Sequence, residues 1–388
     1  MQQKKIKILF AINCMNIGGA PSVVFAQIKY LDKEKFEPHL LMLYPSKEAN
    51  FLKQLDFLPK EHIIQFKLCN RSIFDISTLR NIYRYLRRER FDVVYTHLFL
   101  ANFLVRMLAI IARVPIILSF EHSTYFNKSS WQIIADRILA KWTDRIVVST
   151  QEVADFTSTQ EYLPGELFSV IRNPVTIPVQ TLVDENELWD LTGFDRGGVL
   201  FLTIGRFSEE KGQHILLEAA MRVHVLNPKS KFLIVGHGPQ EGILRGLVSK
   251  NNMDEYFRIL HMPERAKEFL YIADWFVLPS LREGQSIVVE EAMLAGVPVI
   301  TSALPGMGQV VTAGENGFLV ETGNVESLQS ALSCVLNEGL DRKNFSDKAL
   351  LTAEKLLNTD DRMRRFESLL LSLYADKKRS AVNFSKTQ

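Results

Sequence analysis

The chain has 388 residues, of which 47% are hydrophobic, and its formal net charge is +2. This composition supplies a large apolar core and excludes an intrinsically disordered protein, and the length is typical of two domains. The small net charge conceals an asymmetry, because residues 1–180 contain 23 Lys and Arg against 16 Asp and Glu, which is +7, and the remainder is −5. A basic first half favours an anionic partner, such as a membrane surface or a phosphorylated acceptor, with chance placement as the alternative.

Cysteine usage and hydropathy indicate a cytoplasmic protein. Three cysteines are far apart and form no metal-ligand spacing, which is typical of a reducing compartment; they are Cys14, Cys69 and Cys334. The apolar run 8–12 is too short for a signal peptide and fits a first strand better. The longest apolar region, 107–118, is interrupted by Arg113 and Pro115, so we expect no membrane-spanning helix.

The first half alternates apolar runs with stretches of helical periodicity, which is the pattern of a parallel α/β sheet. The expected strands are 6–12, 39–43, 63–67, 93–97, 115–120, 145–149 and 168–172. The expected helices are 21–31, 76–90, 98–112 and 131–141. Gly18 and Gly19 stand between the first strand and the first helix, where glycine lets the backbone approach a ligand closely, although many α/β turns need glycine for the turn alone.

Two histidines stand at the ends of expected strands. His97 closes the strand 93–97, and His122 lies in the polar triplet 121–123 that follows the strand 115–120. Ligands of parallel sheets bind at the carboxyl ends of the strands, so both histidines are candidate site residues. The alternative for each is a histidine that only caps or packs.

The second half repeats the α/β pattern after a segment without periodicity, 177–197, which we expect to connect two domains. Strands are expected at 199–204, 232–235, 258–261, 275–278, 297–300 and 318–320. Helices are expected at 264–271, 287–294 and 325–337, with another that ends near residue 226. The chain closes with an amphipathic helix, 361–374, and a polar tail, 375–388, that we expect to fray.

Two groups of residues in this half suggest a nucleotide-sugar pocket. Arg206 and Lys211 lie at a strand-to-helix turn, where two cations can hold a diphosphate; surface solvation is the alternative. Glu283 lies in a later strand-to-helix turn, and Glu291 lies in the helix that follows it. Carboxylates accept hydrogen bonds from sugar hydroxyls. Between the two glutamates, backbone amides at the N-terminus of the expected helix favour a bound phosphate; these amides belong to Gln285, Ser286 and Ile287. An ordinary amphipathic helix with solvated glutamates is the alternative.

These motifs resemble the retaining glycosyltransferases of family 4, also called glycosyl transferases group 1. Glu283-Gly284 and Glu291-Ala292 match the family pattern Glu-Gly-Phe-Gly followed by Glu-Ala, and Gln285-Ser286 depart from its Phe-Gly. Further matches are Gly205-Arg206 with Lys211-Gly212, Gly18-Gly19 and His122. The resemblance covers nearly the whole chain.

The resemblance implies an α/β protein with the GT-B fold, in which two facing Rossmann-like domains flank an interdomain cleft. Residues 1–176 would form the acceptor-side domain, and 177–197 the connection. Residues 198–360 would form the donor domain. Residues 361–388 would contain a helix that crosses back to the first domain and a polar tail.

The implied reaction is transfer of a hexosyl group from a nucleotide diphosphate sugar, expected to be a UDP-sugar, with retained anomeric configuration. The acceptor would be a glycan or a lipid-linked molecule in the synthesis of a surface polysaccharide or glycoconjugate. Arg206 and Lys211 would hold the diphosphate and stabilise the leaving group. Glu291 would bind the ribose and Glu283 the donor sugar. His122, favoured over His97, would contact the sugar near the reacting carbon.

The donor would also contact a set of small and polar residues; these are Gly18, Gly19, Gly284, Gln285, Ser286 and Ile287. No Asp-x-Asp occurs in the sequence, so we expect no metal. We also expect no cofactor and no nucleic-acid partner. The alternatives are another GT-B enzyme, such as a nucleotide-sugar epimerase or a phosphorylase, and a non-catalytic partner subunit. The intact set of charged residues argues against the last.

One expected helix indicates which surface would contact the membrane if the acceptor is a lipid. Four arginines share one side of the helix 76–90; they are Arg80, Arg84, Arg87 and Arg88. Cations near an anionic bilayer surface are attracted to it, so this face could dock peripherally on the inner face of the cell membrane. The alternative is a solvated outer face.

Overall fold

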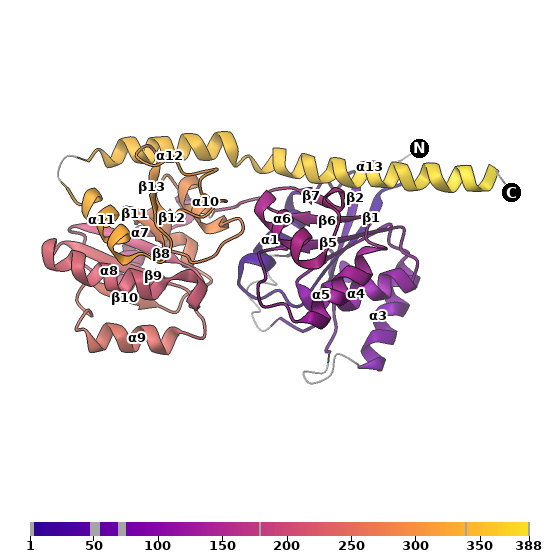
Figure 1. Cartoon of the computed structure of the whole chain (residues 1–388), viewed down its shortest axis with the longest axis horizontal. Helices are drawn as coiled ribbons and strands as arrows, with labels where there is room; N and C mark the ends of the chain where they lie inside the picture. The colour runs from indigo at the N-terminus through magenta and orange to yellow at the C-terminus, as the bar shows by residue number, and fades with distance from the viewer. Residues whose placement is uncertain (1–3, 47–54, 69–74, 178–179, 338–339, 387–388) are drawn as a thin grey trace. The chain divides into compact units, whose positions relative to one another are not determined.

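The computed structural model describes residues 4–46, 55–68, 75–177, 180–337 and 340–386. Cys69 and Pro178 therefore lie outside the described residues, as do residues 387–388 of the polar tail. The chain divides into two compact units (Figure 1). The first comprises Met1–Pro174 and Thr359–Gln388, and the second comprises Val175–Asn358.

The first unit contains a seven-stranded parallel sheet with the order β3-β2-β1-β4-β5-β6-β7. Its strands are β1 Ile6–Ile12, β2 Phe36–Met42, β3 Ile63–Gln65, β4 Val93–His97, β5 Ile116–Glu121, β6 Arg145–Val148 and β7 Phe168–Val170. The central strands are apolar on both faces because helices cover both sides of the sheet. The strand order reverses between β1 and β4, and such a switch point opens a crevice at the carboxyl ends of the strands.

Helices cover both faces of this sheet. They are α1 Gly19–Tyr30, α3 Ile76–Glu89, α4 Phe99–Ile111, α5 Ser130–Ala140, α6 Gln151–Glu161 and α13 Thr359–Lys386, with the short turns η1 Lys60–His62 and η2 Gly165–Leu167. Successive side chains of β1 point to opposite faces, so Ile8 packs with α1 and α13 while Leu9 packs with α3 and α4.

The second unit contains a six-stranded parallel sheet with the order β10-β9-β8-β11-β12-β13. Its strands are β8 Val199–Ile204, β9 Ser230–Val235, β10 Phe257–Leu260, β11 Trp275–Leu278, β12 Val299–Ser302 and β13 Gly317–Val320. Its helices are α7 Glu185–Thr192, α8 Gln213–Leu226, α9 Glu241–Lys250, α10 Ile287–Leu294, α11 Val325–Val335 and α12 Arg342–Leu356, with the turns η3 Gln180–Leu182, η4 Glu209–Lys211 and η5 Ala266–Tyr271. Both sheets have the strand order of the Rossmann-like domains expected from the sequence.

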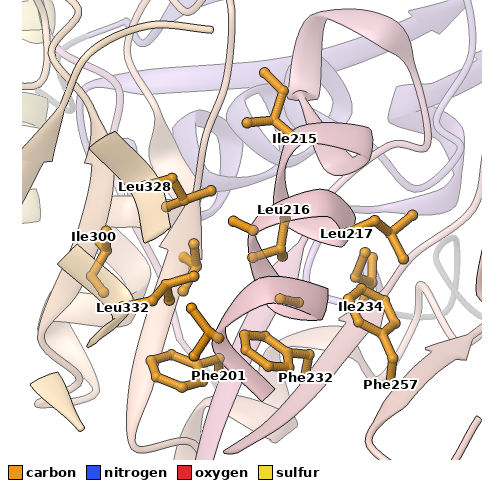
Figure 2. Close-up of a cluster of buried hydrophobic side chains, with 14 of the residues drawn as sticks. Phe201, Ile215, Leu216, Leu217, Phe232, Ile234, Phe257, Ile300, Leu328 and Leu332 are labelled. Atoms are coloured by element: carbon orange, nitrogen blue, oxygen red, sulfur yellow. The ribbon is translucent and has the colours of Figure 1, made fainter. Parts of the chain in front are cut away.

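The core of the second unit lies on both sides of its sheet. Figure 2 shows one side, where Phe201 of β8 and Phe232 of β9 lie beneath Leu216 of α8. The two phenylalanine rings are stacked with centroids 5.0 Å apart. Leu328 and Leu332 of α11 belong to the same cluster, as do Phe201 of β8 and Trp275 of β11, so this layer of helices packs on the central strands of the sheet.

The helix expected at 264–271 is present as the 3-10 helix η5. Two expectations about local structure need correction. The segment 177–197 contains α7, whose Leu188 is fully buried in the second unit, so this part of the expected connection is folded. The tail is helical to Lys386, and Lys377 forms an ion pair with Asp144 of the first unit at 2.8 Å, which holds the helix beyond residue 374. Helices α6, α7, α9 and α12 are absent from the sequence-based expectations.

Among the described residues, no helix combines the length and the apolar character that crossing a bilayer requires. The region 107–118, the longest apolar one, is divided between α4 and β5.

Candidate active site

The predicted donor residues of the second unit come from two loops at the switch point of its sheet. Strands β8 and β11 are neighbours, with Phe201 opposite Trp275, and the strand order reverses between them. The loop after β8 carries Arg206 and Lys211, and the loop after β11 carries Glu283. In open α/β sheets a ligand binds outside the carboxyl ends of the strands at this position.

The two loops are packed against each other through their backbones. The amide of Leu281 donates a hydrogen bond to the carbonyl of Glu210 at 2.8 Å. Gly212 has φ +64°, and a Cβ at this position would lie 2.0 Å from the carbonyl oxygen of Pro279. Glycine is therefore required at 212 both by its left-handed conformation and by the close approach of the second loop.

Lys211 and Glu283 form an ion pair across these loops. Lys211 Nζ lies 2.5 Å from Glu283 Oε1, and the Ser280 hydroxyl donates to the same oxygen at 2.9 Å. The side chain of Glu283 is 10% exposed and that of Lys211 is 21% exposed. The structure thus brings together the cation expected to hold phosphate and the carboxylate expected to hold the sugar.

Arg206 is placed beside this pair in sequence but its side chain is not part of it. Its carbonyl accepts a hydrogen bond from Gln213 Nε2 of α8 at 2.9 Å, which fixes the backbone of the turn. The side chain is exposed and makes no hydrogen bond or ion pair with another described residue. Its guanidinium group therefore remains available to a solvent-borne anion.

The N-terminus of α10 carries an unused polar group. Ser286 is the N-cap residue, yet its side chain does not cap the helix, and its buried Oγ has no hydrogen-bond partner among the described residues. Gln285 donates to Glu290 Oε2 at 2.9 Å, Gly284 is buried, and Ile287 begins the helix. A buried hydroxyl without a partner is costly, and the amides of the first helical turn lack intrahelical acceptors, so this end of α10 can bind an anion.

Glu291 is already paired, with a residue that sequence reasoning missed. Glu291 is buried, and its Oε1 lies 2.5 Å from Lys267 Nζ of η5, which also donates to the carbonyl of Thr176 at 3.3 Å. Burial raises the pKa of Glu291, and the neighbouring Lys267 opposes this rise. Lys267 carries no local signal in the sequence, because it meets Glu291 only through the fold.

In the first unit, the two candidate histidines are in contact. His97 Nδ1 lies 3.3 Å from His122 Nε2, so the ends of β4 and β5 bring both rings together. Desolvation lowers the pKa of both rings, for His122 to about 3. His97 is fully buried and His122 is half-buried, so His122 is the one that solvent reaches, and both are uncharged at neutral pH.

Gly18 and Gly19 lie at the start of α1, where the chain itself leaves space. Gly18 has an extended backbone, which other residues adopt as readily. A Cβ on Gly18 would meet Pro21 Cδ at 3.8 Å, and a Cβ on Gly19 would meet no described atom within 4 Å. The packing of the described residues therefore does not require glycine here, and the space above the first turn of α1 is open to a ligand.

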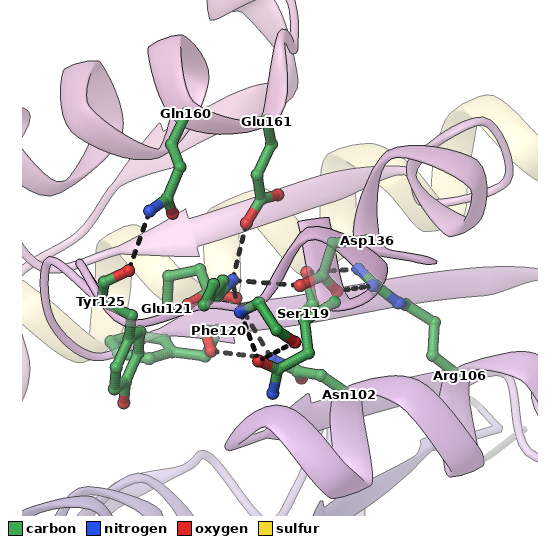
Figure 3. Close-up of polar contacts among 12 residues, drawn as sticks. Asn102, Arg106, Ser119, Phe120, Glu121, Tyr125, Asp136, Gln160 and Glu161 are labelled. Atoms are coloured by element: carbon green, nitrogen blue, oxygen red, sulfur yellow. Dashed lines mark hydrogen bonds and ion pairs between the residues drawn. The ribbon is translucent and has the colours of Figure 1, made fainter. Parts of the chain in front are cut away.

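A buried ionic network lies beneath the loop that carries His122, and sequence reasoning did not anticipate it (Figure 3). Lys128 Nζ contacts three buried carboxylates, Glu121 at 3.3 Å, Asp136 at 3.0 Å and Glu161 at 2.6 Å. Arg106 of α4 pairs with Asp136 at 2.5 Å. These contacts tie the loop that begins at His122 to α4, α5 and α6. Glu121 and Lys128 flank residues 122–127, so the network fixes both ends of the segment that contains His122.

The three carboxylates of the network are close enough to share a cation. Glu121, Asp136 and Glu161 are one of two groups of potential metal ligands among the described residues; the other is Glu37, His39 and His62. The Lys128 ammonium already contacts all three acids of the first group. Neither group includes a residue predicted for the donor site.

Comparisons with known proteins agree with the arrangement of both units. The family model for Glycosyltransferase Family 4 matches residues 17–177, and the model for Glycosyl transferases group 1 matches residues 188–351. The first match therefore spans β2–β7 of the first sheet, and the second spans all six strands of the other sheet.

Curated relatives span nearly the same length. The chain is 26% identical over 349 residues to the Escherichia coli UDP-Gal:alpha-D-GlcNAc-diphosphoundecaprenol alpha-1,3-galactosyltransferase, covering 86% of this chain and 89% of the relative. It is 20% identical over 383 residues to N-acetyl-alpha-D-glucosaminyl L-malate synthase of Bacillus anthracis, covering 97% of this chain and all of the relative.

A solved structure has the same fold. Anabaena HepE, solved in complex with UDP-glucose, superposes with a TM-score of 0.78 at 19% identity, covering 95% of this chain and 100% of that chain. With both sheets, both family models and these relatives in agreement, the chain belongs to the family 4, group 1 glycosyltransferases and has the GT-B fold.

Proposed function

We propose that the protein is a retaining, metal-independent hexosyltransferase that moves a sugar from a UDP-sugar to a lipid-linked glycan in the synthesis of a surface polysaccharide or glycoconjugate. The observation that carries the proposal is the Lys211–Glu283 ion pair at the switch point of the donor sheet. The unused N-terminus of α10 supports the same assignment. The retained configuration rests on the family resemblance, and the absence of a metal rests on the missing Asp-x-Asp motif.

The ion pair suggests how the donor enters the site. Diphosphate oxygens would replace Glu283 as partners of Lys211, with Arg206 as the second cation. The freed carboxylate of Glu283 would then accept hydrogen bonds from hydroxyls of the donor sugar. Cations that are already oriented toward the leaving diphosphate stabilise the charge that develops on it in the transition state.

The remaining donor contacts come from the same unit and from His122 of the first unit. The Ser286 hydroxyl, which has no partner among the described residues, and the N-terminal end of α10 would bind a phosphate oxygen. Glu291, held by Lys267, would accept hydrogen bonds from the ribose hydroxyls. His122 would contact the sugar near the reacting carbon as a neutral imidazole, which can donate or accept a hydrogen bond and adds no charge.

The donor and acceptor classes are taken from proteins that this chain resembles. The E. coli relative is named for UDP-Gal and a diphosphoundecaprenol acceptor, and HepE was solved with UDP-glucose. The B. anthracis relative is named for a small acceptor, L-malate, which makes a soluble acceptor the second candidate. The net charge of +7 in residues 1–180 favours the lipid-linked acceptor.

The test is a donor screen with product analysis. The protein is incubated with UDP-sugars and GDP-sugars, and thermal stabilisation and nucleotide release are measured with and without a polyprenyl-diphosphate sugar acceptor. We expect stabilisation by UDP and UDP release that depends on the acceptor, with an α-linked product from an α-linked donor. An epimerised sugar, a sugar phosphate formed from a glycan, or no turnover with any donor would instead support an epimerase, a phosphorylase or a non-catalytic subunit.

A further inference from the structure

Helix α4 is apolar on almost all sides, and its two polar residues are buried. A helix on the surface of a soluble domain normally turns its apolar stripe inward and a polar side outward. In α4 the polar residues Asn102 and Arg106 are 1% and 2% exposed. Figure 3 shows both side chains reaching into the buried network beside Ser119 and Asp136. The buried side of α4 is otherwise apolar, with Leu104, Val105 and Leu108 in the core. The outer side is also apolar; it consists of the partly buried Phe99, Leu100, Phe103, Met107 and Ile110, and of Ile111, which is 57% exposed.

Helix α5, next to α4, likewise buries a charged residue and exposes large apolar ones. Its acidic residue, Asp136, is buried in the same network. Large apolar side chains at helical spacing remain about half exposed on α5 and just beyond it; they are Trp131 at 50%, Ile134 at 57%, Ile138 at 49% and Trp142 at 55%. The network thus holds Arg106 and Asp136 inside, while large apolar side chains of both helices reach the surface.

The two helices form one continuous apolar face, which we call the α4–α5 face. At one end, Trp131 packs edge-on against Phe99 and Phe103, with centroids 5.2 and 5.9 Å apart. At the other end, Ile110 and Trp142 line the same surface cavity of about 390 Å³. Contiguous exposed apolar surface of this kind marks an interaction site.

Most charges around the α4–α5 face are positive. Arg113 and Lys141 line the same surface cavity, whose acidic residue Asp144 is paired with Lys377, and Arg137 is exposed on α5 itself. Helix α3 lies beside α4 in the same layer, and Arg87 Nη1 donates to the carbonyl of Ala112 at the end of α4. The four arginines noted in the sequence are all exposed on α3, so they extend the cationic border.

We propose that the α4–α5 face docks on an anionic lipid membrane, with its tryptophan and isoleucine side chains in the interfacial layer and the arginines of α3 at the headgroups. Tryptophan prefers the bilayer interface, and apolar burial together with cations gives reversible binding without a spanning segment. A second copy of this chain would place two cationic borders against each other, whereas an anionic bilayer satisfies the apolar and the charged groups together. The proposal deepens the lipid-linked acceptor proposed above and corrects the sequence-based interpretation, in which the arginine helix alone forms the docking surface.

The test is binding of the full-length protein to vesicles of phosphatidylglycerol and phosphatidylcholine, compared with phosphatidylcholine alone. We expect sedimentation with the anionic vesicles, weakened by salt, and quenching of tryptophan fluorescence by brominated lipid through Trp131 and Trp142. Replacing Ile134 and Ile138 together by serine should weaken binding at least about tenfold. Reversing Arg84 and Arg88 to glutamate should remove the preference for anionic lipid.

The matched control is Val225→Ser with Leu226→Ser on α8 of the second unit, where the two side chains are 77% and 67% exposed. This control should bind vesicles like the wild type, and UDP should stabilise every variant equally, because none of the substituted residues is a proposed donor contact. Unchanged vesicle binding by the isoleucine variant would overturn the proposal, as would a dimer that this variant dissociates without any lipid dependence. If UDP does not stabilise the wild type, the proposed transferase function is overturned, and the vesicle-binding result still stands.

Discussion

The Lys211–Glu283 pair permits a sharp test of the donor site. Lys211 lies on the short turn η4 and is 21% exposed, so Lys211→Ala should leave the core intact. If the ammonium acts as an oriented charge on the leaving diphosphate, its loss should raise the barrier by about 2–4 kcal/mol, which lowers kcat/KM by roughly 30- to 1000-fold. Arg206→Ala should have an effect of the same order.

The ion pair adds a second expectation, which concerns the double variant. In Lys211→Ala, the nearly buried Glu283 keeps the Ser280 hydroxyl but loses its cation. Some of the measured loss therefore comes from the unpaired carboxylate rather than from the missing ammonium. The combined loss in Lys211→Ala with Glu283→Ala should consequently fall short of the sum of the two single losses by about 0.5–3 kcal/mol.

The assay is steady-state UDP release by the wild type, by the single variants Lys211→Ala, Arg206→Ala and Glu283→Ala, and by the double variant. Circular dichroism verifies the fold. Lys250→Ala is the matched control, because Lys250 is an exposed lysine at the end of α9 in the same unit. Turnover close to normal in both Lys211→Ala and Arg206→Ala would refute the assignment of the diphosphate site. Strictly additive losses would refute the coupling between Lys211 and Glu283.

Three further predictions follow from the described contacts. Glu291→Ala should weaken binding of free UDP and Glu283→Ala should weaken only the UDP-sugar, each by about 1.5–3 kcal/mol in calorimetric titrations; equal losses for both ligands would contradict the division between ribose and sugar. Activity should persist in excess EDTA, and a complete loss that magnesium or manganese restores would show that a metal takes part. Burial raises the pKa of Glu161 to about 7 from its usual 4.5, so its stabilising contribution is present below about pH 4.5 and is lost as the pH rises through 7. The free energy of unfolding should therefore fall by about 3 kcal/mol over this pH range in the wild type, and Glu161→Gln should make this fall smaller. A pH dependence of urea unfolding that is the same in both proteins would contradict the raised pKa of Glu161.

Much of the fold could be predicted because parallel strands buried on both faces leave continuous apolar runs in the sequence. The runs 6–12 and 199–204 coincide with β1 and β8, and the glycine at 212 marks a backbone position where a side chain would clash. Helices such as α12 were not predicted because their composition is polar and the apolar face is short. The helical part of the tail beyond residue 374 was not predicted because long-range contacts, such as that of Lys377 with Asp144, hold it in place.

The sequence by itself determined the candidate site residues at the strand ends, because strand, turn and helix signals are local. Only the tertiary structure decided how these residues are paired, since Lys211 and Glu283 are 72 residues apart and Lys267 and Glu291 are 24 apart. The same holds for α4 and α5. Helical periodicity places Arg106 and Ile110, four residues apart, close together on α4, but it does not show that the charged side chain is buried while the apolar one is only partly buried. The burial of Arg106 depends on Lys128, Asp136 and Glu161, which come from other elements and make the burial of a charged side chain favourable.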